Sequence, residues 1–228
     1  MSLSDTFRVS LSEDEDMLET FRMISQSFGN DAPFVNAYFP AHNTPVGQTN
    51  GAERLLAWKQ SSPQSTFLKA VSTQEEKDTI IGMSVWTYMT EAPPQTLEDA
   101  EGEEGLRKYW PDEQGREWME ALWKEYVKPR TKAVTNSNGE GIYVLELLAV
   151  HPQYRRLGVG ARLTNWGVSK ADEKKVGAVV ESTDAGRPLY EKCGLQCEIE
   201  QITFDVGDKF DAKVPKLAFM VKGATARF

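Results

Sequence analysis

The sequence lacks the marks of several protein classes. Its two cysteines, Cys193 and Cys197, cannot form a disulfide framework, and they suit a reducing compartment. No apolar run approaches the ~20 residues that a membrane-spanning helix needs. The start of the chain, residues 1–5, shows no basic region leading into an apolar core, as a signal peptide would. We therefore expect a cytoplasmic protein without a membrane partner.

An excess of positive charge is missing as well. The chain carries 26 Lys and Arg against 34 Asp and Glu, which gives a net charge of −8 at pH 7. Because a nucleic-acid-binding surface needs a basic face, nucleic acid is not an expected partner. The two histidines, His42 and His151, stand outside any acid–nucleophile pattern of a hydrolase. Cys193-x3-Cys197 has no accompanying zinc ligands, so we predict no bound metal.

What is present is the composition of a globular protein. The 228 residues are 40% hydrophobic and 26% charged, and they are enough to bury a sizeable core. Ser12-Glu13-Asp14-Glu15 is typical of a capping box, with a helix running to about Phe28. Residues 30–50 and 91–116 are rich in proline, glycine or acids and should be irregular loops. The remaining predicted elements are strands at 7–11, 66–71, 79–89, 142–150, 178–182, 195–206 and 216–222, helices at 52–60, 118–126, 157–175 and 187–193, and a turn at 72–78.

The second half of the chain alternates strand and helix. This order predicts parallel pairing between the strands at 142–150 and 178–182, while the last two strands should form a hairpin. We therefore expect one α/β domain with a mixed sheet over residues 1–228. The segment 91–135 is interpreted as an insertion into that domain, and no feature of the sequence indicates the oligomeric state.

One stretch carries a chemical signature. A buried strand ends at Pro152, two arginines follow, and Gly158-Val159-Gly160 opens a helix. The first N–H groups of a helix lack internal partners, and glycines let a bulky anion approach them. The Walker pattern is absent, and a dinucleotide site would want a third glycine where Leu163 stands. The segment thus predicts a phosphate or diphosphate site of another kind.

The pattern Arg155-x-x-Gly158-x-Gly160, after Leu148-Ala149-Val150-His151-Pro152, resembles the pyrophosphate loop of the GCN5-related N-acetyltransferases, the GNAT superfamily. Downstream, Leu189-Tyr190-Glu191-Lys192-Cys193-Gly194-Leu195 is similar to the family's Leu-Tyr-x-x-x-Gly-Phe segment, with Leu195 in place of Phe. The likeness is specific over residues 142–195. Within the family it looks most like the fungal-type branch.

The resemblance implies a GNAT-like α/β fold. Its central sheet would be mixed and mostly antiparallel, flanked by helices, with the parallel strands 142–150 and 178–182 splayed around the pantetheine arm of acetyl-CoA. The first two helices and the last hairpin would form the acceptor pocket, with the segment 30–50 above it. The residues expected to bind the cosubstrate acetyl-CoA are Leu148, Ala149, Val150, Arg155, Arg156, Leu157, Gly158, Val159, Gly160, Ala161 and Ser182, and of the two arginines Arg156 is the stronger candidate for phosphate.

Two residues are candidates for proton transfer. By resemblance, Tyr190 would protonate the departing thiolate, although a tyrosine on a short helix also fits a packing role. Glu146 lies inside an apolar strand, where a carboxylate is costly unless it is paired or functional. It fits a general base for an ammonium acceptor and equally a salt bridge to a neighbouring strand.

The aromatic residues give a weaker signal. Trp86 and Tyr88 alternate on a strand, so one side of that strand is expected to line the pocket. Trp58, Trp118, Trp123 and Trp166 fall on helix faces and are interpreted as core. The resulting hypothesis is an N-acetyltransferase that moves acetyl from acetyl-CoA to a primary amine, of a small molecule, by direct attack in a ternary complex. The alternative is a catalytically degenerate acyl-CoA-binding module that acts as a sensor or partner protein.

Overall fold

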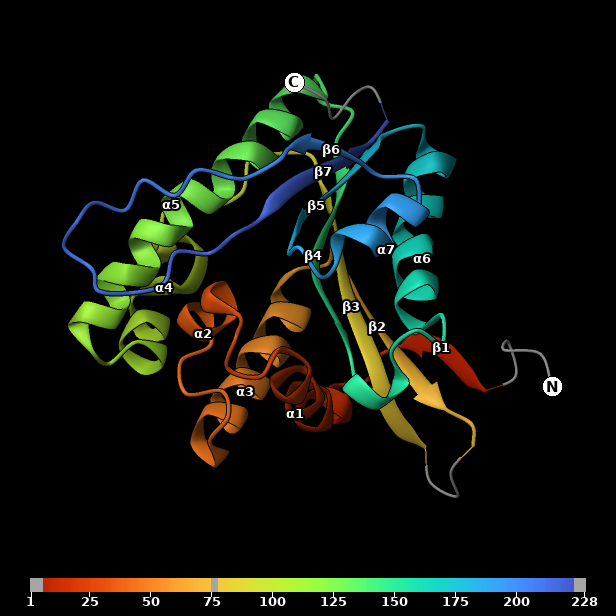
Figure 1. Cartoon of the computed structure of the whole chain (residues 1–228), viewed down its shortest axis with the longest axis horizontal. Coiled ribbons are helices and arrows are strands. Elements are labelled where there is room, and N and C mark those ends of the chain that lie inside the picture. Colours follow the sequence, from red (N-terminus) through yellow and green to blue (C-terminus); the bar gives the residue numbers. More distant parts are fainter. Residues whose placement is uncertain (1–5, 75–77, 224–228) are drawn as a thin grey trace.

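A single seven-stranded sheet organises the chain (Figure 1). The structure is a computed structural model that describes residues 6–74 and 78–223. The strand order is β1-β2-β3-β4-β5-β7-β6, and every neighbouring pair is antiparallel except β4 and β5. This confirms the predicted fold class. The strands are β1 (Phe7–Leu11), β2 (Ser65–Ser72), β3 (Thr79–Met89), β4 (Ile142–Val150), β5 (Gly177–Ser182), β6 (Gln196–Ile199) and β7 (Ala218–Lys222).

Helices cover both faces of this sheet (Figure 1). One face packs on α6, whose Leu163 and Val168 share a core with Ala178 and Val180 of β5. The alternate residue, Val179, points to the other face and packs with α4 and α5. There α1 and α3 cover the β2–β4 half. The helices are α1 (Met17–Phe28), α2 (Pro33–Tyr38), α3 (Pro45–Ser61), α4 (Leu97–Tyr109), α5 (Glu113–Asn136), α6 (Val159–Lys174) and α7 (Arg187–Lys192).

The expected loop at 30–50 is wrong, because α2 and the start of α3 occupy it. Pro33 and Pro45 stand at the first turn of these helices, where a missing N–H costs nothing and the fixed φ suits the helix. The Thr44 side chain caps α3 by accepting from the N–H of Gly47 at 3.1 Å. The prolines that suggested a loop therefore begin helices.

The expected loop at 91–116 is also wrong, since α4 fills most of it. Thr96 caps α4 by accepting from the N–H of Asp99, and the acids of the first turn favour the positive end of the helix dipole. Gly102, at a φ of +71°, interrupts the helix. Leu97 and Trp110 are each 1% exposed, so this segment belongs to the core beside α5. The assignment of 91–135 as an insertion stays a prediction.

The last two strands pair antiparallel as predicted, but the first is shorter than expected. β6 ends at Ile199, not at residue 206, and residues 200–217 run as an extended loop before β7. β7 then lies between β5 and β6. The loop therefore returns the chain across the sheet edge and brings residues 213–217 to the surface cavity described below.

Two predictions concern residues that the structure does not describe. The expected turn at 72–78 includes residues 75–77, and the expected absence of a signal peptide rests on residues 1–5. Within residues 6–74 and 78–223, none of the helices combines the length and the apolar character needed to cross a membrane.

Candidate active site

Strands β4 and β5 lie side by side only over their first residues. Their parallel pairing ends at Val144 and Val179, although β4 continues to Val150 and β5 to Ser182. The two strands therefore part, as the resemblance implied. A sheet opened in this way leaves backbone donors and acceptors unpaired along both inner edges, where an extended ligand can reach them.

A β-bulge lies at the mouth of this split. On the other edge of β4, Val85 stands opposite Leu147 and Trp86 opposite Leu145, so the intervening Glu146 has no partner on β3. A bulge inserts one extra residue and re-aims its side chain. Here it turns the carboxylate of Glu146 toward the space between the strands, where Glu146 lines a cavity.

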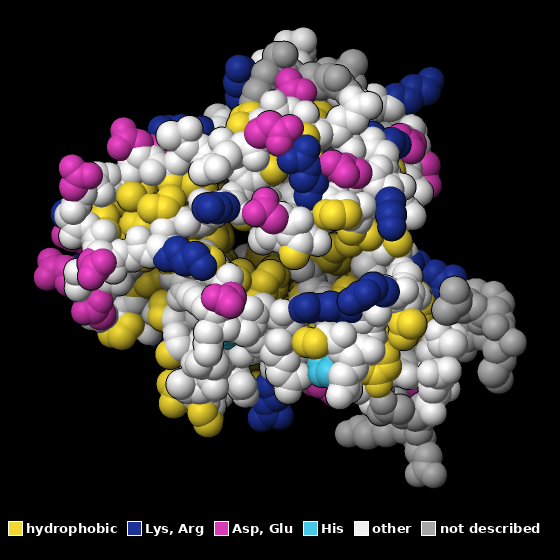
Figure 2. Space-filling model, in the orientation of Figure 1, with side chains coloured by type: hydrophobic (Ala, Val, Ile, Leu, Met, Phe, Trp, Pro, Cys, Tyr) yellow, Lys and Arg dark blue, Asp and Glu magenta, His cyan; other side chains and the backbone are white. Residues whose placement is uncertain are grey.

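That cavity has a volume of about 1710 Å³, which exceeds the 300–1,000 Å³ of most small-molecule sites. It runs from the start of α6, through the split, to the space between α2, α4 and the loop at 213–217. Figure 2 shows it as a hollow in the middle of this face, with an apolar floor and charged side chains around the rim. The cavity has room for a long cosubstrate and an acceptor together.

The start of α6 forms one end of the cavity. Among the described residues, the backbone N–H groups of 156–161 donate to no acceptor, and the first helical bond runs from Arg162 N–H to the Gly158 carbonyl at 3.0 Å. Gly158 has a φ of +86°, which glycine adopts without strain. A Cβ on Gly160 would lie 3.0 Å from Leu189 Cδ2, so glycine keeps the wall open. Free donors at a helix start fit a phosphate group.

The two arginines of this loop differ in their surroundings. The Arg155 guanidinium donates to the Ser27 carbonyl at 2.6 Å and to the Val150 carbonyl at 3.4 Å, which fastens the loop to α1 and β4. Arg156 has a φ of +63° and is exposed, and its side chain has no hydrogen-bond or ion-pair partner among the described residues. Arg156 is therefore the arginine left available for an anion, in line with the preference drawn from the sequence.

The other residues predicted to bind acetyl-CoA divide into two groups. Leu148, Val150, Gly158 and Ala161 line the cavity, whereas Leu157 is 39% exposed beside it. The side chains of Ala149, Val159 and Ser182 are buried at 2%, 1% and 1% exposure, and the Ser182 hydroxyl donates to the Thr183 carbonyl. Any contact by Ala149 or Val159 would therefore come from the backbone, and their roles stay predictions.

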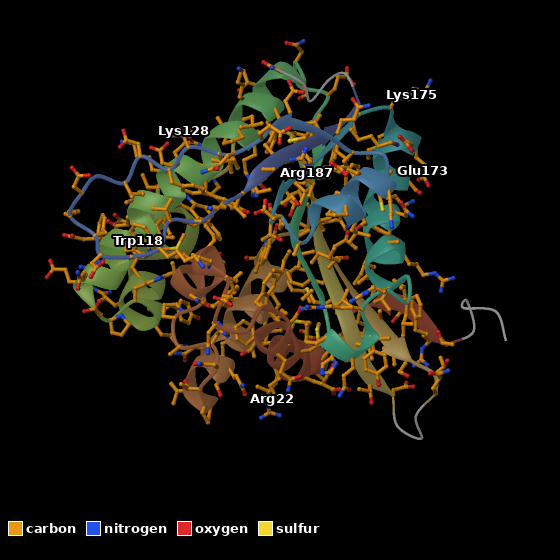
Figure 3. The ribbon with its side chains drawn as sticks, in the orientation of Figure 1. Arg22, Trp118, Lys128, Glu173, Lys175 and Arg187 are labelled. Carbon is orange, nitrogen blue, oxygen red and sulfur yellow. The ribbon has the colours of Figure 1, made fainter. Side chains whose placement is uncertain are left out.

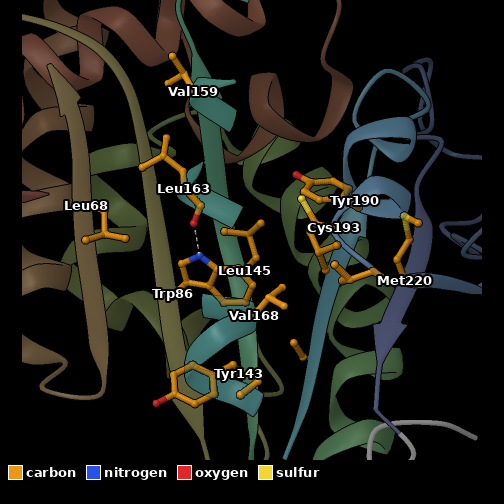
Figure 4. Packing of buried hydrophobic residues seen from close by; sticks show 14 of the residues in the cluster. Leu68, Trp86, Tyr143, Leu145, Val159, Leu163, Val168, Tyr190, Cys193 and Met220 are labelled. Atoms are coloured by element: carbon orange, nitrogen blue, oxygen red, sulfur yellow. Dashed lines mark hydrogen bonds between the residues drawn. The ribbon is translucent and has the colours of Figure 1, made fainter. Parts of the chain in front are cut away.

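Tyr190 approaches the cavity from α7. Its ring is 7% exposed and packs in the same cluster as Cys193, beside it in Figure 4, and it lines the cavity opposite β4. Burial raises the pKa of the Tyr190 hydroxyl well above its usual range, with a smaller contribution from Cys193. No hydrogen-bond partner occupies this hydroxyl among the described residues. A neutral phenol facing the cavity is able to donate a proton or a hydrogen bond.

Glu146 has a charged partner that the sequence did not identify. Arg130 of α5 donates to Glu146 through Nη1 and to Glu181 of β5 through Nε, at 2.9 Å, and Nη2. The expected alternative, a salt bridge to a neighbouring strand, is thus replaced by one to a helix. Burial raises the pKa of the Glu146 carboxyl, while Arg130 and the Thr87 hydroxyl oppose the rise and Glu181 adds to it.

Aromatic side chains form the far wall of the cavity. Phe34 and Tyr38 of α2 stand against Trp123 and Tyr126 of α5, with ring centroids 4.2–6.1 Å apart. Tyr38 also donates to Glu101 of α4 at 2.8 Å. The segment 30–50, which holds Phe34 and Tyr38, was expected above the acceptor pocket, but none of these aromatic residues was named, because their segments were interpreted as loop or core. The periodicity of α5 alone cannot tell a residue that faces a cavity from one that faces a core.

The expectations about tryptophan need correction. Trp86 is 0% exposed and donates to the Leu163 carbonyl of α6 at 3.1 Å, so its side of β3 faces the helix, as Figure 4 shows. The opposite side of β3 lines the cavity through Thr87 and Met89. Trp123 and Trp58 line the cavity, contrary to the interpretation as core alone. Trp118, at the far end of α5 in Figure 3, packs on Phe210.

Comparison with protein families agrees with this geometry. Residues 119–196 match the family model described as acetyltransferase (GNAT) domain. This part of the chain, about a third of its 228 residues, is therefore similar to a GNAT acetyltransferase domain. The matched segment begins inside α5 and ends at the first residue of β6, so it contains the bulge, the split, the start of α6 and Tyr190. No curated protein matches the chain in sequence. The fungal-type branch stays a prediction.

Solved structures share the fold at low identity. An arylalkylamine N-acetyltransferase 2 from Aedes aegypti aligns with a TM-score of 0.63 and 17% identity, covering 95% of this chain and 98% of that one. A protein described as histone acetyltransferase HPA2 and related acetyltransferase, from Corynebacterium glutamicum, aligns at 0.60 and 15%, covering 96% of each. A PaiA N-acetyltransferase from Thermoplasma acidophilum, in complex with coenzyme A, aligns at 0.52 and 13%, covering 96% and 99%.

Proposed function

We propose that this chain is an acetyl-CoA-dependent N-acetyltransferase that acetylates a primary amine of a small molecule by direct attack in a ternary complex. The observation that carries the proposal is the split between β4 and β5, with free backbone donors at one end and Glu146 and Tyr190 on its walls. The fold shared with an N-acetyltransferase structure described in complex with coenzyme A supports it.

The chain's own groups suit each part of acetyl-CoA. The N–H groups of 156–161 and the Arg156 side chain would bind the pyrophosphate. His151 N–H donates to the Ile81 carbonyl of β3, so the N–H of the adjacent Val150 points the other way, into the split, while the Val150 carbonyl accepts from Ser27 and Arg155. The pantetheine amides would bond there, and the Val150 N–H would lie near the thioester oxygen and stabilise its developing charge.

The acceptor side of the cavity suits an amine that carries an apolar body. One guanidinium, from Arg130, faces the carboxylates of Glu146 and Glu181, so one negative charge of this group is uncompensated and would attract an ammonium. The rings of Phe34, Tyr38 and Trp123 offer flat apolar walls next to it. The Aedes protein of the same fold is described as an arylalkylamine acetyltransferase, which agrees with such an acceptor.

The proposed reaction moves two protons through the chain. Glu146 accepts a proton from the acceptor ammonium, and the free amine nitrogen attacks the thioester carbon. The new N–C bond forms as the C–S bond breaks, and the Tyr190 hydroxyl protonates the departing sulfur. The second proton that the attacking nitrogen loses restores the Tyr190 hydroxyl, and Glu146 releases its proton to solvent. The products are an acetamide and coenzyme A with a free thiol. Holding both substrates in one cavity supplies much of the acceleration by proximity.

Acetyl-transfer assays test this proposal directly. Purified protein is mixed with acetyl-CoA and a panel of arylalkylamines, polyamines, amino acids, aminoglycosides and peptides, and free thiol is followed over time. We expect turnover with at least one small amine and little with peptides. Acetyl-CoA binding in calorimetry without thiol release from any amine would favour the catalytically degenerate binding module. Absence of binding would contradict both functions.

A further inference from the structure

Arg130 is a buried arginine whose side chain reaches both edges of the split sheet. The side chain is 2% exposed and comes from α5, on the acceptor side of the cavity. The guanidinium donates to the Glu181 carboxylate of β5 through Nε and Nη2. It donates to the Glu146 carboxylate of β4 through Nη1. The Tyr126 hydroxyl accepts a further bond from Arg130 Nη2 at 2.7 Å. A planar guanidinium fixes direction as well as distance in such contacts.

The place of these contacts is informative. Glu146 is the bulged residue of β4, and Glu181 lies on β5 beyond the last parallel pair, at Val179. No backbone hydrogen bond joins the two strands at this level. The Arg130 side chain is therefore a side-chain bridge across a gap that the sheet itself leaves open.

Stability alone does not account for this group. A buried ion pair loses hydration about as much as it gains attraction, and apolar residues of similar size often serve equally well. One arginine with one glutamate would at least balance the charge. Here a second carboxylate, that of Glu181, is also buried, since its side chain is 1% exposed. Its burial adds a desolvation cost. A net negative group kept beside a cavity points to a use at that cavity.

We propose that Arg130 and Glu181 are positioning residues, which hold the Glu146 carboxylate at the split in the orientation needed to take a proton from the acceptor. The inference rests on the proposed function. Arg130 sets the direction of the Glu146 carboxylate, and Glu181 holds Arg130 in place from the opposite strand. Neither residue touches the reacting atoms in this proposal.

The charges around Glu146 give the two residues opposite effects. The groups that face it are Arg130 and Tyr126 from α5, Glu181 from β5, the Thr87 hydroxyl from β3, and Tyr38 from α2, behind which Glu101 of α4 pairs with Arg54 of α3. Arg130 lowers the pKa of Glu146 and Glu181 raises it. Removing Glu181 should therefore lower the pKa of Glu146, whereas removing Arg130 should raise it.

The experiment measures kcat/KM against pH for a set of variants, using thiol release with the best amine. In wild type, kcat/KM should fall at low pH as Glu146 becomes protonated, and this fall is the acidic limb of the profile. The limb should disappear in Glu146→Gln, which assigns it to Glu146. We expect Glu181→Gln to move the limb to lower pH and Arg130→Lys to lower kcat on the order of 100-fold, as misplaced groups do. Arg130→Met/Glu181→Gln removes both partners without leaving Glu181 ionised and unpaired, and it should move the limb to higher pH.

Glu125→Gln is the matched control. Glu125 is a buried carboxylate of the same helix, 6% exposed, paired with Lys128 and outside the cavity lining. Its removal should leave the limb where it is. Limbs that stay in place in the Glu181 and double variants, or that move in the same direction, would overturn the proposal and leave the bridge a structural feature.

A measurement without turnover separates this inference from the proposed function. Titration of the Glu146 carboxyl carbon by NMR, in wild type and in the same variants, should show the two opposite displacements. A chain that releases no thiol contradicts the proposed function, and the titration then decides the positioning by itself. Unchanged titration curves in an active enzyme would overturn only the positioning.

Discussion

At the scale of single residues, burial gives Tyr190 and Glu146 complementary properties. It raises the pKa of both groups, which keeps the Tyr190 phenol protonated and brings the Glu146 carboxyl closer to neutrality. A phenol that keeps its proton suits a donor, and a carboxylate that holds a proton more readily suits an acceptor. The same physical cause therefore suits Tyr190 and Glu146 to the opposite proton transfers that we propose for them.

Tyr190→Phe should lower the turnover rate with little effect on acetyl-CoA affinity. The ring and its packing beside Cys193 remain, and only the hydroxyl is lost. General acids typically contribute ~100- to 10,000-fold, and because a thiolate is already a fair leaving group we expect the low end of that range or below it. Stopped-flow measurement of the chemical step and calorimetry of acetyl-CoA binding provide the two numbers. Equal losses in both would show that the hydroxyl positions the cosubstrate and is not the acid.

At the scale of elements, α6 has a different task at its start and in its middle. Its first turn presents free N–H groups to the cavity. A Cβ at Gly160 would lie 3.0 Å from Leu189 Cδ2, so glycine leaves the space beside these N–H groups open. About two turns later, at Gly167, the helix lies directly on the sheet. A Cβ at Gly167 would stand 2.1 Å from the Trp86 ring, so glycine is required there for packing. We therefore propose that Gly160 serves binding, whereas Gly167 serves packing.

Gly160→Asp should abolish acetyl-CoA binding in a folded protein. A carboxylate at the helix start would repel the pyrophosphate and occupy the free donors, each worth roughly 1.5–3 kcal/mol as a charge-assisted bond. Gly160→Ala is the control, because it brings the same crowding against Leu189 without the charge. Calorimetric titration compares the two. Wild-type affinity in the Asp variant would refute the phosphate-loop assignment.

Gly167→Ala should destabilise the fold, although alanine normally favours a helix interior. The added methyl group would overlap the fully buried indole of Trp86 and force helix and sheet apart, at a cost of about 1–3 kcal/mol. Urea unfolding followed by fluorescence measures the change. Asn165→Ala, at an exposed position of the same helix, should be neutral or stabilising. A neutral Gly167→Ala would mean that Trp86 moves freely.

At the scale of the whole molecule, the cavity divides the helices that cover one face of the sheet. α1 and α3 lie on one side of it, and α4 and α5 lie on the other, with the loop at 213–217 and α7 closing the rim. A ligand that fills the split contacts β4, β5 and the start of α6 at once. Binding should therefore stabilise the fold as a unit.

Saturating acetyl-CoA should raise the melting temperature. At a concentration of ~100 Kd the linkage amounts to ~2.7 kcal/mol, or roughly 5–10 °C for a chain of this size. Thermal unfolding with and without acetyl-CoA tests this, and Gly160→Asp should show no shift. A shift of equal size in that variant would place the ligand elsewhere on the molecule.

Local patterns in the sequence were sufficient to predict the helices and strands from β4 to α7. The apolar run at 142–150 predicted the parallel pair, and the glycines at the start of the next helix predicted a turn with free backbone donors. The place of Tyr190 near the split was implied by the family resemblance of residues 189–195. These features depend on neighbouring residues, because strand alternation, helix starts and glycine conformations are short-range properties. The same reasoning failed at Pro33 and Pro45, where a residue typical of loops also begins helices.

Only the tertiary structure decided the acceptor side of the cavity. Arg130 and Glu146 come from consecutive elements, and Glu181 joins them from a strand 51 residues beyond Arg130. The spacing of the three residues in the sequence does not predict this contact. The bulge at Glu146 depends on the register of β3 against β4. Trp123 lines the cavity because of the way α5 packs on the sheet. Periodicity indicates which residues share a face, but packing between distant elements determines what that face meets.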